Sequence, residues 1–227
     1  MYPSLKRLFD LLFAGLAIII LSPLLIPVVI GLRLTGEGYV FYLQERVGYR
    51  NRLFNIYKFA TMLKDSPNMA GGIITTKRDP RITPMGGFLR KTKINELPQL
   101  LNVLRGEMSF VGPRPVMQLS FDQYPPDVQE VIYQVTPGIT GIGSLIFRDE
   151  EELITRAKAQ GLDPWEYYKT VIYPYKGQVE QWYQAHQSFY VDFMILVLTA
   201  LAILLPGRHL YRRVFPGVPA RPAEMEV

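Results

Sequence analysis

The sequence contains no cysteine, which excludes a disulfide framework, a thiolate nucleophile and a cysteine-based zinc site. Histidine is almost absent too, because His186 and His209 are the only two and lie far apart in the chain. A histidine-rich metal site is therefore not expected, and both residues are interpreted as ordinary surface or interfacial side chains. The sequence also has no internal repeat and no low-complexity linker.

Acidic side chains are scarce in the middle of the chain. Between Gln44 and Arg114 there are thirteen Lys and Arg residues against five Asp and Glu, an excess of eight positive charges in a chain whose formal net charge is +5. Such a concentration is typical of proteins that bind phosphates, although a solvated basic face has the same composition. The segment has no recognised nucleic-acid motif and no ordered stacking aromatics, so nucleic acid is not an expected partner.

A long apolar run lies near the N-terminus. Residues Leu11 to Leu32 carry no charged side chain, and 22 residues are long enough to form a transmembrane helix. Pro23 and Pro27 interrupt the run, and Ser22 precedes a proline, so we expect a kink at Ser22-Pro23. Each arm is then too short to cross a bilayer, which favours a re-entrant hairpin. The Ser22 hydroxyl can donate a hydrogen bond to the backbone carbonyl that the proline leaves without a donor. A kinked spanning helix is the alternative.

A second, shorter apolar run covers Phe193 to Leu205 and is ended by Pro206-Gly207. Thirteen residues are too few for an ordinary span, and aromatic and basic residues flank the run, which favours an interfacial helix. A buried core helix is the alternative. The proline-rich last dozen residues are expected to fray.

The polar middle of the chain mixes strands and helices. Tyr39–Tyr42 and Phe54–Phe59 are predicted strands joined by a turn at Gly48–Arg52. Apolar residues at helical spacing predict one helical stretch from Phe88 to Gly106, where the glycine stops it. Residues 112–115, Gly-Pro-Arg-Pro, cannot be helical. Residues 149–168 are expected to form one or two amphipathic helices.

The segment from Thr83 to Pro115 carries a specific resemblance. It reads TPMGGFLRKTKINELPQLLNVLRGEMSFVGPRP and resembles the core signature of the monotopic phosphoglycosyl transferases, also called bacterial sugar transferases. Shorter strings in the same order support the resemblance: KRLFD at residues 6–10, Ser22-Pro23, QERVG at 44–48, IYKF at 56–59 and TPGITG at 136–141.

The resemblance implies an α+β fold with an N-terminal re-entrant membrane helix-break-helix, interfacial amphipathic helices and a small β-hairpin associated with helices. It divides the chain into a membrane hairpin (1–36), a catalytic core (37–145), amphipathic helices completing the same domain (146–213) and a C-terminal tail (214–227). It implies a protein of the bacterial inner (cytoplasmic) membrane, at its cytoplasmic face, and admits a homodimer.

The activity that the resemblance implies is Mg²⁺-dependent transfer of a sugar phosphate from a UDP-sugar to undecaprenyl (polyprenyl) phosphate, with release of UMP. Two phosphate-bearing substrates require cations, and arginine is the best planar phosphate partner. The substrate-binding candidates are cations or members of the matched motifs: Lys58, Arg81, Arg90, Gln99, Pro113, Arg114 and Pro115. Glu96 and Asn95 are the candidate catalytic residues and Mg²⁺ ligands, because Mg²⁺ prefers oxygen donors.

The main departure from the family pattern is at residue 95, with smaller ones at Ala60 and at Gly141-Ile142-Gly143. The family uses an adjacent Asp-Glu pair whose Asp forms a covalent phospho-sugar intermediate, whereas this sequence has Asn95-Glu96. A carboxamide is a poor nucleophile, and asparagine is also a common helix N-cap. Several alternatives stay open: Glu96 acts as nucleophile or base, the lipid phosphate attacks directly, the residue is an introduced substitution, or the chain is a catalytically silent homologue that binds nucleotide sugar or scaffolds glycan assembly.

Overall fold

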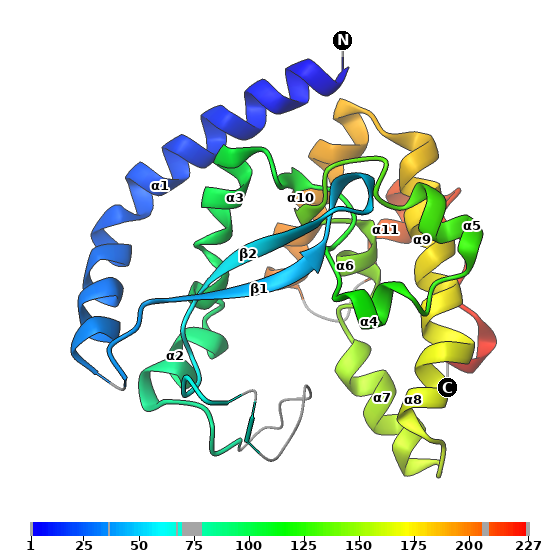
Figure 1. Cartoon of the computed structure of the whole chain (residues 1–227). Helices are drawn as coiled ribbons and strands as arrows, with labels where there is room; N and C mark the ends of the chain where they lie inside the picture. The colour runs from blue at the N-terminus through cyan, green and yellow to red at the C-terminus, as the bar shows by residue number, and fades with distance from the viewer. Residues whose placement is uncertain (1, 36, 67, 70–78, 206–208, 226–227) are drawn as a thin grey trace. The chain divides into compact units, whose positions relative to one another are not determined.

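The computed structural model describes residues 2–35, 37–66, 68–69, 79–205 and 209–225. It is an α+β structure in which helices predominate and two small sheets contribute the strands, as the sequence predicts (Figure 1). Contacts divide the chain into two compact units. Unit 1 consists of Met1–Arg7, Arg46–Phe54 and Gly106–Val227, and unit 2 of Leu8–Glu45 and Asn55–Arg105.

The N-terminal apolar run forms one helix, α1 (Tyr2–Leu34), of 33 residues. Among the described helices it is the one long and apolar enough to cross a membrane. Most of its large apolar side chains are exposed, with Ile19 71% accessible to solvent. In water such a surface would be strongly unfavourable, which is the reason to place this helix in lipid.

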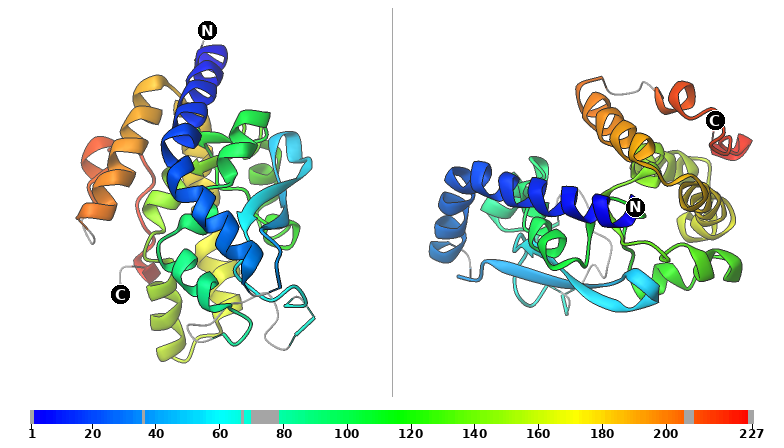
Figure 2. Two further views of the ribbon diagram at one scale, coloured as in Figure 1. Left: turned by 90° about the vertical axis from the view of Figure 1, so that its left-hand side faces the viewer. Right: turned by 90° about the horizontal axis from the view of Figure 1, so that it is seen from above.

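The predicted break at Ser22-Pro23 needs a correction, because these residues stay helical. Pro23 has no N–H to donate to the carbonyl of Ile19, and the Ser22 hydroxyl donates to that oxygen instead, at 2.8 Å. The expected rescue of a freed carbonyl by Ser22 is therefore present. Figure 2 shows that α1 nevertheless changes direction along its length, so the prolines bend the helix without interrupting it.

The C-terminal end of α1 packs into the core of unit 2. Val28 and Leu32 are buried together with Phe59 of β2 (Leu53–Phe59) and Leu89 of α2 (Pro84–Lys91). Gly31 fits close against the Met85 side chain, where a Cβ would collide with it. The membrane helix is thus an integral part of this unit.

The predicted hairpin is present, but its first strand is shifted toward the C-terminus. β1 covers Phe41–Val47, and β2 pairs with it to form a two-stranded sheet. The turn contains Arg50 and Asn51 at positive φ (54° and 57°), a conformation that non-glycine residues rarely adopt. The hairpin belongs to both units, since its turn end (46–54) is assigned to unit 1.

The single helical stretch predicted from Phe88 to Gly106 is in fact three short pieces. α2 ends at Lys91, a 3₁₀ turn covers Ile94–Glu96, and α3 covers Gln99–Arg105. Lys93, at φ 61°, reverses the chain between the first two. The predicted stop at Gly106 is confirmed, where φ is +82°.

Unit 1 is built around short helices and a second sheet that the sequence did not predict. β3 (Ser109–Val111) and β4 (Gly138–Thr140) pair in parallel, with Ser109 opposite Gly138 and Val111 opposite Thr140. The helices of this unit are α4 (Gln118–Phe121), α5 (Pro126–Val131), α6 (Ile142–Ile146), α7 (Glu150–Ala159), α8 (Pro164–Tyr167), α9 (Tyr173–His186), α10 (Phe189–Leu204) and α11 (Tyr211–Val214). The expected helices in residues 149–168 are α7 and α8.

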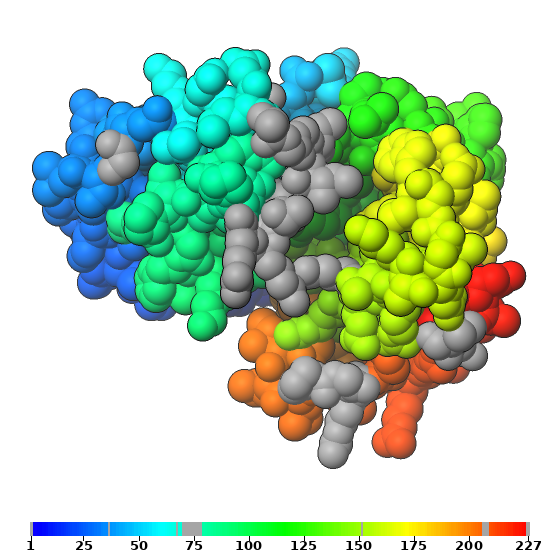
Figure 3. Space-filling model, turned by 90° about the horizontal axis from the view of Figure 1, so that it is seen from below, coloured from blue at the N-terminus to red at the C-terminus, as the bar shows by residue number. Residues whose placement is uncertain are grey.

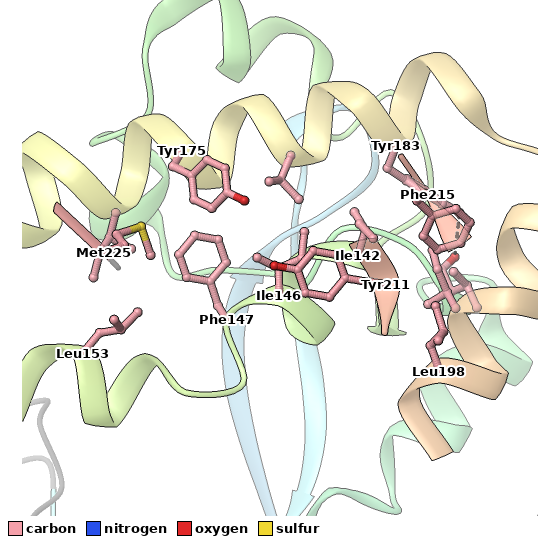
Figure 4. Close-up of a cluster of buried hydrophobic side chains, with 14 of the residues drawn as sticks. Ile142, Ile146, Phe147, Leu153, Tyr175, Tyr183, Leu198, Tyr211, Phe215 and Met225 are labelled. Atoms are coloured by element: carbon pink, nitrogen blue, oxygen red, sulfur yellow. Dashed lines mark hydrogen bonds between the residues drawn. The ribbon is translucent and has the colours of Figure 1, made fainter. Parts of the chain in front are cut away.

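The main core of unit 1 gathers around α6 and α9. Ile146, Phe147 and Tyr175 are buried in it, with Leu198 of α10 and Tyr211 of α11 reaching in from the C-terminal part of the chain (Figure 4). A buried surface of this kind supplies most of the favourable free energy of folding.

The second apolar run forms α10, one face of which is buried and the other exposed. Ile195 is fully buried whereas Phe193 is 62% accessible. The alternative of a buried core helix thus holds for one face, and the interfacial placement of the exposed apolar face stays a prediction. Pro206 and Gly207, expected to end the run, lie outside the described residues.

The C-terminal segment does not fray as predicted. Arg221 makes a bidentate ion pair with Asp149 at 2.8 and 2.6 Å, and Met225 is 2% accessible. The Tyr167 hydroxyl donates to the carbonyl of Glu224, and Figure 3 shows the red C-terminal residues lying against the yellow-green residues of α7 and α8. Specific side-chain contacts therefore outweigh the proline-rich composition here.

Candidate functional site

Six of the predicted site residues belong to unit 2 and three to unit 1. Unit 2 contains Lys58, Arg81, Arg90, Asn95, Glu96 and Gln99, whereas unit 1 contains Pro113, Arg114 and Pro115.

The unit 2 candidates are arranged around a single core. Phe59, Leu89 and Ile94 pack in one cluster with α1. Lys58, Arg90 and Asn95 are the direct neighbours of these three residues in sequence, and all three are half-buried. The backbone positions of two cations and of Asn95 are thus next to the core that the C-terminal end of α1 joins.

Local turns fix the backbone of this cluster. The Thr83 hydroxyl caps α2 by accepting from the N–H of Gly86 at 3.0 Å, and Pro84 occupies the first helical position. The N–H of Lys93 donates to the carbonyl of Arg90, and the N–H of Glu96 donates to that of Lys93. Arg90 and Glu96 are therefore joined by two successive backbone hydrogen bonds.

Asn95 lies in the middle of the 3₁₀ turn, where it does not cap a helix. Lys93 is the N-cap residue of that turn. The amide oxygen of Asn95 is buried and has no hydrogen-bond partner among the described residues. Gln99, which is 2% accessible, has an amide nitrogen in the same situation. Buried polar atoms are nearly always paired, so an unmatched acceptor and donor four residues apart indicate a binding site.

Lys58 is held by side chains from the hairpin and α3. Its ammonium group donates to the side-chain oxygen of Gln44 across the hairpin at 3.1 Å. Asn102, fully buried on α3, accepts from the N–H of Tyr57 at 2.9 Å and donates to the carbonyl of Asn55 at 2.8 Å. Asn102 therefore fixes the strand that carries Lys58. The only feature of the sequence that pointed to Asn102 was its position within the matched motif.

Arg81 has a structural partner. It is 2% accessible, and its guanidinium makes two hydrogen bonds to the carboxylate of Asp79, at 2.9 and 2.6 Å. A third bond reaches the carbonyl of Ser66 at 3.2 Å. This buried pair organises the loop before α2, which is an evident role for Arg81 apart from substrate binding.

In unit 1, Arg114 is exposed on a turn between two buried prolines. Three glycines allow this turn to pack closely on β4, because a Cβ at Gly112, Gly138 or Gly141 would collide with the backbone of the facing segment. The N–H of Gly112 donates to the carbonyl of Thr140, and the N–H of Gly138 to that of Pro113. The GPRP and TPGITG strings are thus two sides of one packed turn.

Tyr133 also contacts this turn, and no sequence motif pointed to it. Its side chain is fully buried, and burial raises the pKa of its hydroxyl above the ordinary value, while the guanidinium groups of Arg46 and Arg114 act in the opposite direction. Both arginines therefore lie within electrostatic range of the same hydroxyl.

Among the predicted site residues of unit 2, Glu96 and Asn95 are the ones expected to offer oxygen donors to a divalent cation. The described residues contain no cluster of three or more Asp, Glu, His or Cys side chains of the kind that forms an all-protein metal site. Mg²⁺ typically takes one or two carboxylates together with substrate phosphates, and the buried, unmatched amide oxygen of Asn95 next to Glu96 fits that requirement.

The chain is similar to known proteins of the family that its motifs resemble. The family model described as bacterial sugar transferase matches residues 1–206. An undecaprenyl-phosphate glucose phosphotransferase from Komagataeibacter xylinus is 39% identical over 66% of this chain and 29% of that protein. The exopolysaccharide production protein ExoY of Rhizobium meliloti is 34% identical over 75% of this chain and 82% of that protein.

A third relative, an undecaprenyl-phosphate galactose phosphotransferase from Salmonella typhimurium, is 33% identical over 88% of this chain and 40% of that protein. The chain therefore spans less than half the length of several curated relatives that it matches. Since the family model matches residues 1–206 of the 227, the chain belongs to the bacterial sugar transferase family.

Proposed function

We propose that this chain is a phosphoglycosyl transferase that moves a sugar 1-phosphate from a UDP-sugar to undecaprenyl phosphate and releases UMP. The observation that carries the proposal is the shared core of unit 2. Lys58, Arg90 and Asn95 adjoin core residues that pack directly on the C-terminal end of α1. A phosphate-binding group beside a membrane helix suits a reaction between a water-soluble diphosphate and a lipid phosphate.

The topology of α1 is part of the proposal. At its N-terminal end, Tyr2 and Lys6 bind the carboxylate of Asp192 in unit 1, and at its C-terminal end Val28 and Leu32 pack into unit 2. A straight spanning helix would separate its ends by the whole bilayer, about 30 Å of hydrocarbon. With about 50 Å of helix and a bend at the prolines, both ends can return to one face. We propose the cytoplasmic face of the bacterial inner membrane.

Each candidate has a role in the proposed reaction. Arg90 and Lys58 bind the diphosphate of the donor, and Gln99 donates its unmatched N–H to a phosphate oxygen. Arg114, which belongs to unit 1, binds a phosphate group of a substrate. Glu96 and the amide oxygen of Asn95 hold Mg²⁺, which when bound neutralises phosphate charge.

Two routes are chemically open. In direct transfer, an oxygen of the lipid phosphate attacks the β-phosphorus of the UDP-sugar, the bond from that phosphorus to the bridging oxygen breaks, and UMP leaves with the electron pair. In the two-step route, the Glu96 carboxylate attacks the β-phosphorus and expels UMP, and an oxygen of the lipid phosphate then attacks the same phosphorus and releases the carboxylate. The carboxamide of Asn95 is a poor nucleophile and takes part in neither attack.

The test uses the full chain in lipid nanodiscs with Mg²⁺ and undecaprenyl phosphate. UDP-glucose, UDP-galactose and UDP-N-acetylgalactosamine labelled at the β-phosphate are the donors, and UMP and lipid-bound label are measured. We expect UMP release only with the lipid, and a loss of about 100-fold or more in Glu96→Gln. The matched control is Glu130→Gln, an exposed carboxylate in unit 1. Full activity in Glu96→Gln would refute the site.

Wild type and Asn95→Asp together separate the remaining alternatives. In wild type, lipid-bound product without labelled protein supports direct transfer, and labelled protein that disappears in Glu96→Gln supports the two-step route through Glu96. A second candidate function, a silent homologue that binds nucleotide sugar, is favoured by Asn95 itself. It predicts UMP binding without turnover, with activity gained only in Asn95→Asp.

A further inference from the structure

The turn that carries Arg114 lacks two of its own hydrogen-bond donors, because prolines at 113 and 115 have no N–H. Its two ends are fixed by the neighbouring backbone. The carbonyl of Pro113 accepts from the N–H of Gly138, and the carbonyl of Val116 accepts from the N–H of Val47, both at 2.9 Å. The carbonyl of Arg114 and the N–H of Val116 remain, one on each side of Pro115.

A single hydroxyl binds both of these groups. The Tyr133 hydroxyl donates to the carbonyl of Arg114 at 2.8 Å and accepts from the N–H of Val116 at 3.1 Å. This uses its donor and one of its acceptor positions, as a buried hydroxyl requires. It therefore bridges the two groups that a γ-turn would join directly.

Tyr133 is itself held firmly. Its ring is stacked on Phe121 with centroids 5.8 Å apart, and Val47 and Ile132 belong to the same buried cluster. Its carbonyl accepts from the N–H of Arg50 in the hairpin turn at 2.8 Å. Burial raises the pKa of the hydroxyl, so the group stays protonated and keeps donating throughout the physiological range.

We propose that Tyr133 is a positioning residue for Arg114: its hydroxyl fixes the backbone on both sides of Pro115, so that the exposed guanidinium is preorganised to bind a substrate phosphate. The inference rests on the proposed function, in which Arg114 makes that contact. Preorganisation of this kind is costly to lose, since binding groups must be held within about 0.5 Å of their productive position.

The test is a double-mutant cycle on the full chain in nanodiscs. Wild type, Tyr133→Phe, Arg114→Ala and the double variant are compared by kcat and KM for the UDP-sugar donor and by melting temperature. Tyr175→Phe is the matched control, because it removes another buried hydroxyl of unit 1 that donates to a backbone carbonyl, that of Pro219 at 2.9 Å.

We expect Tyr133→Phe to lower kcat/KM about tenfold, equivalent to the loss of one well-placed hydrogen bond. Tyr175→Phe should lower the melting temperature about as much as Tyr133→Phe does, but it should leave kcat/KM within about twofold of wild type. In the Arg114→Ala background, Tyr133→Phe should have no further effect, because the group it positions is already gone.

Three results would refute either the positioning role of Tyr133 or the phosphate contact of Arg114, and they distinguish the two claims. Unchanged kcat/KM in Tyr133→Phe refutes the positioning role, as does an equal loss in both Arg114 backgrounds. Full activity in Arg114→Ala instead refutes the phosphate contact of the proposed function. If Tyr133→Phe gives no cooperative melting, 4-aminophenylalanine at 133 keeps a weaker donor and acceptor. It should lower kcat/KM only while Arg114 is present, and an equal loss in both backgrounds again refutes the role.

Discussion

The Ser22 hydroxyl donates a 2.8 Å hydrogen bond to the carbonyl of Ile19, the oxygen that Pro23 leaves without its helical donor. The bend in α1 is therefore stabilised within the helix itself, by one side chain adjacent to the proline. In hydrocarbon this matters more than in water, because an unpaired carbonyl there has no alternative partner.

The bend predicts the side from which each end of α1 is reached. Since the chain has no cysteine, Ser4→Cys and Arg52→Cys give single thiols at exposed positions that flank the apolar run. Both should react with a membrane-impermeant maleimide from the same side of oriented vesicles. In a Pro23→Ala, Pro27→Ala background the helix loses its cause of bending, and the fraction of chains with opposite labelling should rise. Opposite labelling in the wild-type background would refute the re-entrant topology.

Metal removal tests the role of Glu96 and Asn95. Chelation with EDTA should stop UMP release, and added Mg²⁺ should restore it, because the diphosphate charge is otherwise unbalanced. Asn95→Leu keeps the approximate size of the side chain and removes its oxygen, so the Mg²⁺ concentration for half-maximal activity should rise about tenfold or more. Activity that persists in EDTA would contradict the assignment.

Asn102 should be essential for the stability of unit 2. Asn102→Ala removes the fully buried amide that binds the N–H of Tyr57 and the carbonyl of Asn55. We expect the free energy of unfolding to fall by about 2 kcal/mol and the melting temperature by about 4–8 °C. Gln134→Ala is the control, since this exposed side chain binds only the carbonyl of Glu130 nearby in sequence. Equal melting temperatures for the two variants would show that the Asn102 bridge is unimportant.

Glu180 predicts a pH dependence of stability. Its carboxyl group is buried on α9, and burial raises its pKa from 4.5 to about 8, although the ammonium of Lys176 and the N–H of Gly143 act in the opposite direction. Between about pH 5 and 8 the folded state therefore holds a proton that the unfolded state has lost. The free energy of unfolding should fall as pH rises through this window, with a limiting slope of about 1.4 kcal/mol per pH unit.

The measurement is the melting temperature of wild type and Glu180→Gln from pH 5 to 9. The difference between them should move in favour of Glu180→Gln as pH rises, and level off above pH 8. Glu130→Gln, which changes an exposed carboxylate, should give a profile parallel to wild type. Parallel profiles for Glu180→Gln as well would refute the proposed protonation.

Local patterns predicted the elements whose causes are local. The presence of an apolar N-terminal helical segment, the hairpin, the helix end at Gly106 and the non-helical turn at Arg114 follow from apolar runs, glycine and proline. The parallel pairing of β3 with β4 was missed, because it joins Ser109 to Gly138 and neither strand exceeds three residues. The break at Lys93 was missed as well, since lysine takes a positive φ only where the surrounding structure requires it.

In the candidate site, too, some residues were predicted from sequence motifs and others were identified only from the structure. Arg90, Glu96 and Arg114 were predicted from motifs, because phosphate chemistry restricts the residue types at those positions. Tyr133 was not, since its contribution is a pair of backbone hydrogen bonds to residues 17 and 19 positions away, and no periodicity encodes them. Arg81 was predicted to bind substrate because it is a cation in a basic segment, and only the structure reveals its pairing with Asp79.

The contacts at the two ends of α1 have a consequence for how the protein responds to its lipid. A spanning helix adapts to a thicker or thinner bilayer by tilting or sliding. In the proposed topology each end of α1 is attached to folded protein, because Lys6 pairs with Asp192 at one end and Leu32 packs beside Leu89 at the other. Neither end can then move in the lipid without moving the residues that it contacts, and transfer rates should vary little among lipids of different acyl-chain length.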